Sequence, residues 1–294
     1  MWSGSNLFTR LALVVLVSFS SFTTPASSAA EPFVIGGSRP VTVNLPTDTS
    51  QPSPLLIMLH SASTSGAHQE KYMKLGPVAK RLGMIYIAPD GTVGADGRRV
   101  WNAAKACCQK SGEPVDDIAY LDSLIDEIDA KYPVDRNRIY FVGHSNGAFM
   151  SLAFACSTGK VAAVVSLAGA LDTDNQCQSA HPFAFLHIHG VADPTIKING
   201  GVLNGHSYTS AIETLNHVAV ANKCVASKFS QAAFAKKDFD PTIPGLETTV
   251  QKLNNCAAPI VYWRVARGPH SPKLPSNYAE QILTFLASIS KTSE

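Results

Sequence analysis

The sequence of 294 residues lacks several features that would point to particular classes of protein. It has no long run of basic residues and a net charge of only +2, so nothing in it indicates a nucleic-acid-binding protein. It has no internal repeat and no break in composition, and beyond residue 30 no segment is apolar enough to cross a membrane. Charged residues are few at 16% and hydrophobic residues make up 45%, which allows one sizeable core and excludes a mostly disordered chain.

Cysteine is scarce and even in number. The six are Cys107, Cys108, Cys156, Cys177, Cys224 and Cys256. There is no Cys-x-x-Cys, and two adjacent cysteines make a poor zinc site, so we expect no metal and no cofactor. An even count in an exported chain favours disulfides, but the sequence leaves their pairing open.

The first thirty residues have the order of a secretory signal. Arg10 precedes a short apolar core at 11–17, and small residues follow as far as Ala29 and Ala30. The core is too short and its surroundings too rich in serine to suit a membrane anchor. The sequence therefore predicts a signal peptide over 1–30 and a secreted or periplasmic mature domain over 31–294.

Short apolar runs alternate with helical patterns along the chain. We expect strands at 41–44, 55–59, 84–88, 138–142, 161–167, 183–189 and 260–265. We expect helices at 68–82, 118–128, 147–155, 208–222 and 276–288. This alternation predicts a single α/β domain, with a mostly parallel sheet covered by helices on both faces. Residues 225–255 lack clear periodicity and are expected to form an insertion or excursion before the last strand.

One motif, Gly143-His144-Ser145-Asn146-Gly147, fits Gly-x-Ser-x-Gly between an apolar strand and a helix. Such a turn strains the backbone of the serine and brings strand and helix so close that a side chain at either glycine would clash. It exposes the serine oxygen at the carboxyl edge of the sheet, where helix amides favour developing negative charge. The pattern also occurs by chance, but its context favours Ser145 as a nucleophile.

A serine hydroxyl needs a base, and histidine is the usual one. Of nine histidines, His270 is the only one after the last predicted strand, which is where the chain order serine, acid, histidine places the base. His144 is expected to point away from the serine. His187 and His189 alternate along a strand and are expected to be structural; they could hold a metal, but no third ligand is evident.

The acid must lie between Ser145 and His270. Asp193 directly follows a buried strand, so we expect it at the same edge as the serine, fixing the tautomer of the histidine and stabilising its imidazolium form. Asp172 and Asp174 also follow a strand and remain alternatives. The other acids in this interval that we considered are Glu213, Asp238, Asp240 and Glu247.

An oxyanion in such a site needs two hydrogen-bond donors. One should be the backbone amide of Asn146, the residue after the nucleophile. The other should come from the loop after the strand at 55–59, from Ser61 or Ala62.

Together these segments resemble the secreted polyhydroxybutyrate-depolymerase and feruloyl-esterase family of α/β-hydrolases. The matching pieces are Leu59-His60, Pro89-Asp90-Gly91, Trp101-Asn102, Cys107-Cys108, Val115-Asp116-Asp117, the Ser145 motif, Phe154-Ala155-Cys156, His189-Gly190 with Asp193, Gly200-Gly201 and Gly268-Pro269-His270. The resemblance covers about residues 40 to 290 and implies the same triad of Ser145, Asp193 and His270. It also implies that Trp101 lies near the mouth of the site, either stacking on substrate or simply packing, and makes His60 a second candidate for substrate contact.

Three positions depart from that family. Ser61 follows His60 where the family usually has glycine, Ser271-Pro272 follows the histidine where it has tryptophan, and Lys197 stands where it often has proline. These departures imply a different pocket lining and hence a different substrate.

The leading hypothesis is an exported serine esterase without cofactor, acting on oligomeric or polymeric esters such as polyhydroxyalkanoate or feruloylated or acetylated polysaccharide. No nucleic acid or membrane partner is expected, and the oligomeric state is open. A polyamide hydrolase acting on poly(aspartic acid) is an alternative, because Arg98, Arg99, Lys105 and Lys110 could meet an anionic chain, although an ordinary solvated loop is the plainer interpretation. A non-catalytic binding protein on the same fold is the alternative of another class, and we expect such a protein to have lost a triad residue.

Overall fold

The computed structural model describes residues 1–2, 32–94, 96–108, 115–174, 177, 179, 181–225, 234–253 and 255–291. The predicted signal peptide lies outside the described residues except for Met1 and Trp2, and so does Lys110. In the part of the chain that is described, no helix is both long and apolar enough to span a bilayer.

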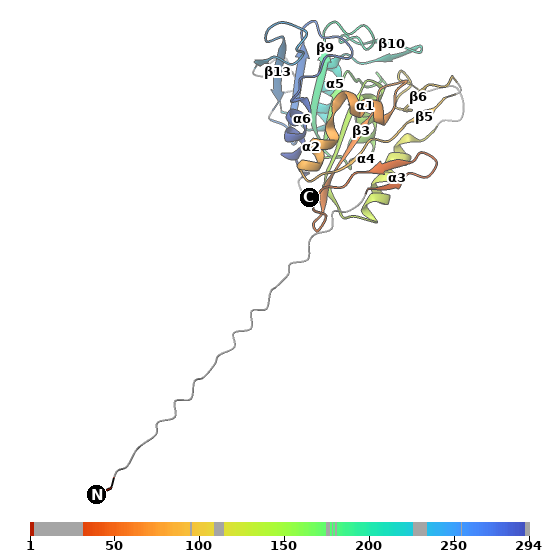
Figure 1. The fold of residues 1–294 in the computed structure, drawn as a ribbon. Helices are drawn as coiled ribbons and strands as arrows, with labels where there is room; N and C mark the ends of the chain where they lie inside the picture. Colours follow the sequence, from red (N-terminus) through yellow and green to blue (C-terminus); the bar gives the residue numbers. More distant parts are fainter. Residues whose placement is uncertain are drawn as a thin grey trace.

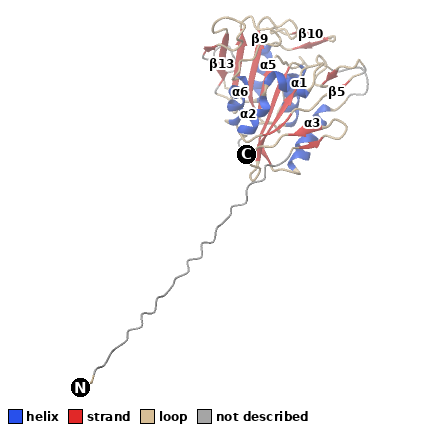
Figure 2. Cartoon of the chain, viewed as in Figure 1, coloured by secondary structure: helices blue, strands red, loops and turns tan. Residues whose placement is uncertain are grey.

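A central sheet of eight strands runs in the order β12-β13-β14-β9-β8-β7-β3-β4 (Figures 1 and 2). Its strands are β3 (Ser53–Leu59), β4 (Ile85–Ile87), β7 (Val134–His144), β8 (Ala163–Leu167), β9 (Ala184–Gly190), β12 (Phe234–Lys237), β13 (Thr248–Leu253) and β14 (Ile260–Val265). The six strands from β14 to β4 are parallel, and β12 and β13 add an antiparallel edge. The predicted mostly parallel sheet is confirmed.

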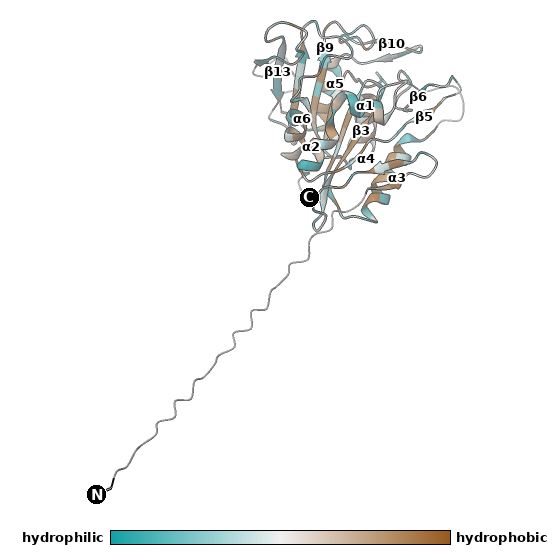
Figure 3. Ribbon diagram, in the orientation of Figure 1, coloured by the Kyte–Doolittle hydropathy of each residue, from teal (hydrophilic) through white to brown (hydrophobic). Residues whose placement is uncertain are grey.

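Helices cover both faces of this sheet. They are α1 (Gly66–Met73), α2 (Leu75–Arg81), α3 (Asp117–Asp129), α4 (Asn146–Thr158), α5 (Ala211–Ala221) and α6 (Tyr278–Ala287). One apolar core lies between the sheet and α3, α4 and α5, and a second lies between the opposite face and α1, α2 and α6. The central strands β3, β8 and β9 are buried on both sides and accordingly mostly apolar, with Ser166, His187 and His189 as buried polar exceptions (Figure 3).

The helix expected at 68–82 is two helices. The chain turns at Lys74, which has a φ of 55°, and α2 begins at the next residue. In one continuous helix the ring of Pro77 would clash with the carbonyl of Met73, four residues earlier. Because Pro77 instead lies in the first turn of α2, where amide hydrogens have no helical acceptor, it is tolerated there.

The described part of 225–255 contains β12 and β13, so this insertion before the last strand extends the sheet at its edge. Among the described residues there are also three two-stranded sheets. They pair β1 (Phe33–Ile35) with β2 (Val41–Val43), β5 (Thr92–Val93) with β6 (Arg99–Val100), and β10 (Gly201–Leu203) with β11 (His206–Tyr208).

Two disulfides connect the helical layer to neighbouring loops. Cys156 at the end of α4 is bonded to Cys177, and Cys224 just after α5 is bonded to Cys256 before β14. Cys107 and Cys108 belong to neither bond. The expectation of disulfides is therefore confirmed for four of the six cysteines.

Candidate active site

Ser145 lies at the turn between β7 and α4. Its backbone has φ 53° and ψ −121°, a conformation that a side-chain-bearing residue rarely adopts and that is typically retained only at functional sites. A Cβ atom on Gly143 would lie 2.3 Å from the carbonyl oxygen of Gly147, and one on Gly147 would lie 2.2 Å from that of Leu59. Both glycines of the motif are thus required by close backbone approach.

The topology brings four loops to one edge of the sheet. Ser145 follows β7, Asp193 follows β9, His270 follows β14, and the loop that begins at His60 follows β3. These four strands are parallel. Strand β14 lies next to β9 and β7 next to β3, with only β8 between β9 and β7, so the carboxyl ends of all four lie close together at one edge. A hydrogen bond of 3.0 Å from the amide of Ala192 to the carbonyl of Gly268 ties the aspartate loop to the histidine loop.

A continuous hydrogen-bond chain joins the three predicted triad residues. The Oγ atom of Ser145 lies 2.9 Å from Nε2 of His270, and Nδ1 of His270 lies 2.7 Å from Oδ2 of Asp193. An ionised carboxylate only accepts, so Nδ1 carries the proton. The lone pair of Nε2 then faces the serine hydroxyl, which is the arrangement that a general base requires.

Asp193 is buried and its two oxygens have separate partners. Oδ1 accepts the amides of Thr195 (2.8 Å) and Ile196 (2.9 Å), while Oδ2 faces His270 and, at 3.5 Å, Nε2 of His189. Burial raises the pKa of this carboxyl, but hydrogen bonds from His189 and His270 outweigh it, so the net pKa lies well below the ordinary value. Asp193 is therefore ionised at neutral pH.

His144 points away from the serine, as expected, and supports the histidine loop. Its Nε2 donates to the backbone carbonyl of His270 at 3.0 Å, and its ring lies between those of Tyr72 and His270, with centroids 5.6 and 5.2 Å away. Burial, followed by the proximity of His270, lowers the pKa of His144 to about 4. It therefore stays neutral at physiological pH.

His187 and His189 form a second buried chain behind the aspartate. Nε2 of His189 donates to the carbonyl of Ile196 at 2.8 Å, so its Nδ1 accepts from Nε2 of His187 at 3.2 Å. The Oγ atom of Ser166 lies 3.2 Å from Nδ1 of His187 and completes the chain as its donor. No group of three metal-ligating side chains is found among the described residues. These histidines hold the aspartate turn, which agrees with the structural role expected for them.

The predicted oxyanion donors lie at the same edge. Asn146 is the first residue of α4, which places its amide at the helix N-terminus. The amide of Ser61 already donates to Oε1 of Gln69 at 3.2 Å, which leaves Ala62 as the better candidate from the β3 loop. Gln69 is buried on α1 and gave no recognisable sequence signal.

Trp101 is buried, so of the two alternatives left open for it, stacking on substrate and simple packing, the structure shows packing. Its side chain is 0% exposed and donates from Nε1 to the carbonyl of His60 at 3.2 Å. The amide side chain of Asn146 binds both backbone polar groups of Trp101, at 2.7 and 2.9 Å. Three hydrogen bonds thus hold the tryptophan between the loop after β3 and α4.

His60 is also 0% exposed, so its predicted contact with substrate is corrected. Its Nδ1 donates to the carbonyl of Ser61 at 2.7 Å, and its Nε2 accepts the amide of Gly91 at 2.9 Å. Burial lowers its pKa, which favours the neutral form with these two bonds. His60 therefore fixes the shape of the loop after β3.

The alternative acids have other partners. Asp172 accepts the amides of Lys105 and Ala106 and so holds the loop of Cys107, while Asp174 faces Lys105. Glu213 caps the start of α5. Glu247 and Asp240 each accept backbone amides, and Asp238 is exposed. None of them contacts His270 among the described interactions.

The described basic residues that could meet an anionic chain are each paired with a carboxylate. Arg98 pairs with Asp96, Arg99 with Asp90 and Lys105 with Asp174, at 2.7, 3.3 and 4.0 Å. This pairing favours the ordinary solvated loop.

The chain is also similar in sequence and in fold to known esterases. Residues 48–232 match the Phospholipase/Carboxylesterase family. Feruloyl esterase B of Piromyces equi is 31% identical over 51% of this chain and 28% of its own length. A probable feruloyl esterase C of Aspergillus flavus is 30% identical over 50% of this chain and 47% of its own. The chain thus spans less than half the length of these two curated relatives.

Solved structures show the fold. An acetyl xylan esterase from Aspergillus awamori superimposes with a TM-score of 0.59 over 87% of this chain and 99% of its own, at 12% identity. The architecture is the α/β-hydrolase fold expected from the motifs. With the family match extending over most of the chain, the protein belongs to the Phospholipase/Carboxylesterase family of α/β-hydrolases.

Proposed function

We propose that the protein is a serine hydrolase that cleaves carboxylic ester bonds through an acyl-enzyme formed on Ser145. The observation that carries the proposal is the unbroken chain of hydrogen bonds from Ser145 through His270 to Asp193. A non-catalytic protein would have no need to keep this chain together with the strained serine backbone.

In the proposed reaction, Nε2 of His270 takes the hydroxyl proton as Ser145 Oγ attacks the ester carbonyl. The amides of Asn146 and Ala62 receive the developing oxyanion. His270 then gives its proton to the leaving alcohol, and Asp193 stabilises the imidazolium in between without being protonated. A water molecule repeats the sequence, using His270 again as base, and releases the acid.

The substrate class we propose is a large or oligomeric ester outside the cytoplasm. Support comes from relatives named as feruloyl esterases and from the two disulfides, which are typical of an oxidising compartment. The signal-like order of residues 1–30 supports export.

Hydrolysis assays on the purified mature protein test this function. The substrates are short nitrophenyl esters, methyl ferulate, hydroxybutyrate oligomers and poly(aspartate). We expect ester cleavage by the wild type, loss in Ser145→Ala, and unchanged rates in Ser123→Ala, which removes a hydroxyl on α3. Release from poly(aspartate) alone would overturn the ester assignment, and equal rates for Ser145→Ala and wild type would overturn the mechanism.

A further inference from the structure

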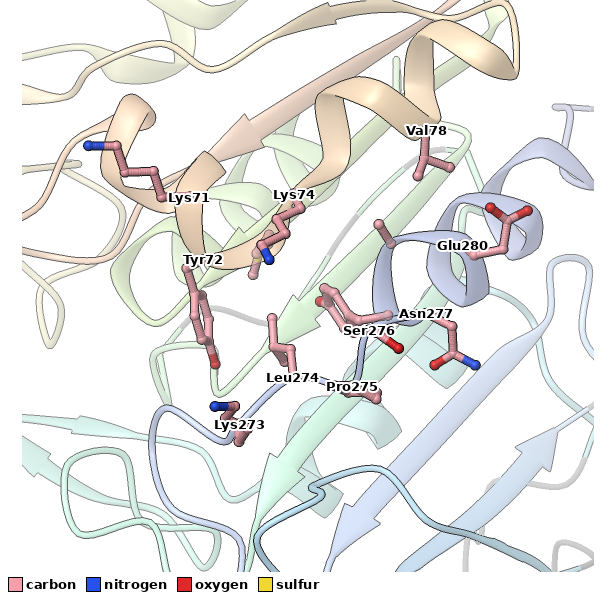
Figure 4. A pocket seen from close by; sticks show the side chains of 13 residues that line it. Lys71, Tyr72, Lys74, Val78, Lys273, Leu274, Pro275, Ser276, Asn277 and Glu280 are labelled. Atoms are coloured by element: carbon pink, nitrogen blue, oxygen red, sulfur yellow. The ribbon is translucent and has the colours of Figure 1, made fainter.

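Helix α1 lies between two loops that the proposed reaction uses. It begins at Gly66, directly after the loop that carries Ala62, and near its end Tyr72 reaches toward the segment that follows His270 (Figure 4). A second polar side chain on the helix, that of Gln69, stands three residues before Tyr72, so the two are neighbours on the helix surface. Each of them is bonded to one of the two loops.

Gln69 holds the loop after β3. Its side chain is buried, and its Oε1 accepts the amide of Ser61 at 3.2 Å. The amide of Ser63 donates to the carbonyl of Arg99 at 2.8 Å. Between these two bonded amides, the amide of Ala62 has no acceptor among the described hydrogen bonds and is left for an oxyanion. Gln69 therefore helps to fix where the proposed donor stands.

Tyr72 holds the segment after the proposed base. Its hydroxyl donates to the carbonyl of Pro272 at 2.6 Å. Burial raises the pKa of Tyr72 well above the ordinary value, so the hydroxyl keeps the proton that it donates. Its ring packs against that of His144, with centroids 5.6 Å apart, and His144 donates to the carbonyl of His270. Tyr72 thus contacts the histidine loop both directly and through His144.

Beyond this contact the helix and the histidine segment separate. A hollow of about 580 Å³ lies between the α1–α2 junction and residues 273–280 (Figure 4). Among the described hydrogen bonds, the one from Tyr72 to Pro272 is the only one that joins α1 to residues 266–277. Without it, the segment has open space beside it into which it can move. His270 would move with it, because only one residue separates it from Pro272.

We propose that Tyr72 is a positioning residue for the general base, and that α1, through Tyr72 and Gln69, sets the separation between the histidine loop and the loop after β3. A base must stand about 3 Å from the hydroxyl that it deprotonates, and a displacement of about 1 Å can lower the rate about 100-fold. The kinetic consequence rests on the proposed esterase function. The structural consequence, a displaced His270, does not.

The variant Tyr72→Phe removes only the hydroxyl and keeps the ring on His144. Tyr140→Phe is the matched control, because the hydroxyl of Tyr140 also donates to a backbone carbonyl at 2.6 Å, that of Ile289 after α6. We expect kcat for a nitrophenyl ester to fall about 10- to 100-fold at similar KM in Tyr72→Phe and to stay unchanged in Tyr140→Phe. Both variants should melt at slightly lower temperature. Equal kcat values for the two variants would overturn the positioning role.

Proton NMR follows the base without turnover. The Nδ1 proton between His270 and Asp193 lies in a charge-assisted hydrogen bond and should give a strongly downfield signal. We expect this signal to shift or broaden in Tyr72→Phe and to be unchanged in Tyr140→Phe. The same signal in both variants would overturn the proposal. A shifted signal in a protein whose wild type cleaves no ester would count against the proposed function alone.

The variant Gln69→Leu tests the link through α1, because it removes the acceptor of the Ser61 amide. Either single change frees one end of the same link, so the double variant Tyr72→Phe/Gln69→Leu should be about as slow as the slower single variant. Circular dichroism checks that each variant is folded, and steady-state kinetics measure kcat. Losses that multiply in the double variant would show two independent effects and would overturn the role of α1.

Discussion

At the scale of single residues, three buried or half-buried histidines near the site differ in role because their hydrogen bonds differ. His270 has a carboxylate on one nitrogen and the serine on the other, His144 has a backbone carbonyl, and His189 has a carbonyl on one side and another histidine on the other. The sequence identified His270 by its place after the last predicted strand. It did not reveal the positioning role of the other two, because that depends on carbonyls brought in by tertiary structure.

Replacement of Asp193 by asparagine tests the role of the carboxylate. Without it, the tautomer of His270 that accepts the serine proton is no longer favoured, and we expect kcat for a nitrophenyl ester to fall by about 10³- to 10⁴-fold. Steady-state kinetics measure this. Asp174→Asn is the matched control, because Asp174 is an exposed acid that also follows a strand. Similar kcat values for the two variants would argue against Asp193 as the triad acid.

His189 provides a test of positioning. In His189→Leu the carbonyl of Ile196 loses its donor and the aspartate turn is released, so we expect kcat to fall about 10- to 100-fold with little change in KM. His189→Gln keeps a donor near the Nε2 position and should recover most of the rate. Phe185→Leu alters packing on the same face of β9 without removing a polar contact, and should lower stability but not kcat. A Gln variant as slow as the Leu variant would contradict this role.

His144 should make the fold sensitive to acid. Its pKa is about 4 in the folded protein and near 6.5 when unfolded, so the unfolded state binds the proton more tightly. Stability from the neutral imidazole is present above pH 6.5 and is lost as pH falls toward 4, by about 3 kcal/mol in all. Urea unfolding at pH 7 and pH 4 should show a smaller loss in His144→Gln than in wild type. An equal loss would rule out His144 as a contributor.

At the scale of elements, the sequence predicted strands well wherever both faces are buried, because a continuous apolar run suffices there. It failed at the junction of α1 and α2, although Pro77 was a visible signal that a single helix could not continue from Met73. It also failed for β13, whose burial alternates irregularly and which forms the sheet edge together with β12. Pairing with β14, not the local pattern, makes that segment a strand.

Helix α3 begins one residue before the predicted range 118–128, and its N-cap, Asp116, can be tested. The side chain of Asp116 accepts the amide of Ala119 at 2.8 Å. Asp116→Ala leaves that amide without its acceptor and should lower the free energy of unfolding by about 1 kcal/mol. Urea denaturation measures the loss, with Ser123→Ala on the same helix as control. A change no larger than in the control would show that the cap contributes nothing.

At the scale of the whole molecule, the site depends on a topology that the sequence could largely anticipate. Parallel strands end at one edge, so residues that follow them converge even when more than a hundred positions separate them, as with Ser145 and His270. The sequence left Trp101 open between stacking on substrate and packing, because the choice depends on the side chain of Asn146 and on a carbonyl of another loop. The pairing of the cysteines was equally inaccessible, since spacing alone does not select one connectivity.

Each disulfide should stabilise the domain by restricting its unfolded chain. The bond between Cys224 and Cys256 closes a loop over a sequence separation of 32, for which chain entropy gives about 3–4 kcal/mol. We expect Cys224→Ser/Cys256→Ser to lose about this much and to melt at lower temperature, while kcat at 25 °C stays the same because the bond lies away from the carboxyl edge of the sheet. Calorimetry and an ester assay check both parts. An unchanged melting temperature would contradict the expectation.

The central claim, that Ser145 is an activated nucleophile, is tested most directly by mass spectrometry after treatment with a fluorophosphonate. The account predicts one adduct per chain on Ser145, formed slowly or not at all in His270→Ala and absent in Ser145→Ala. A folded protein that stays unmodified, or one that is modified at another residue while Ser145 remains free, would contradict it.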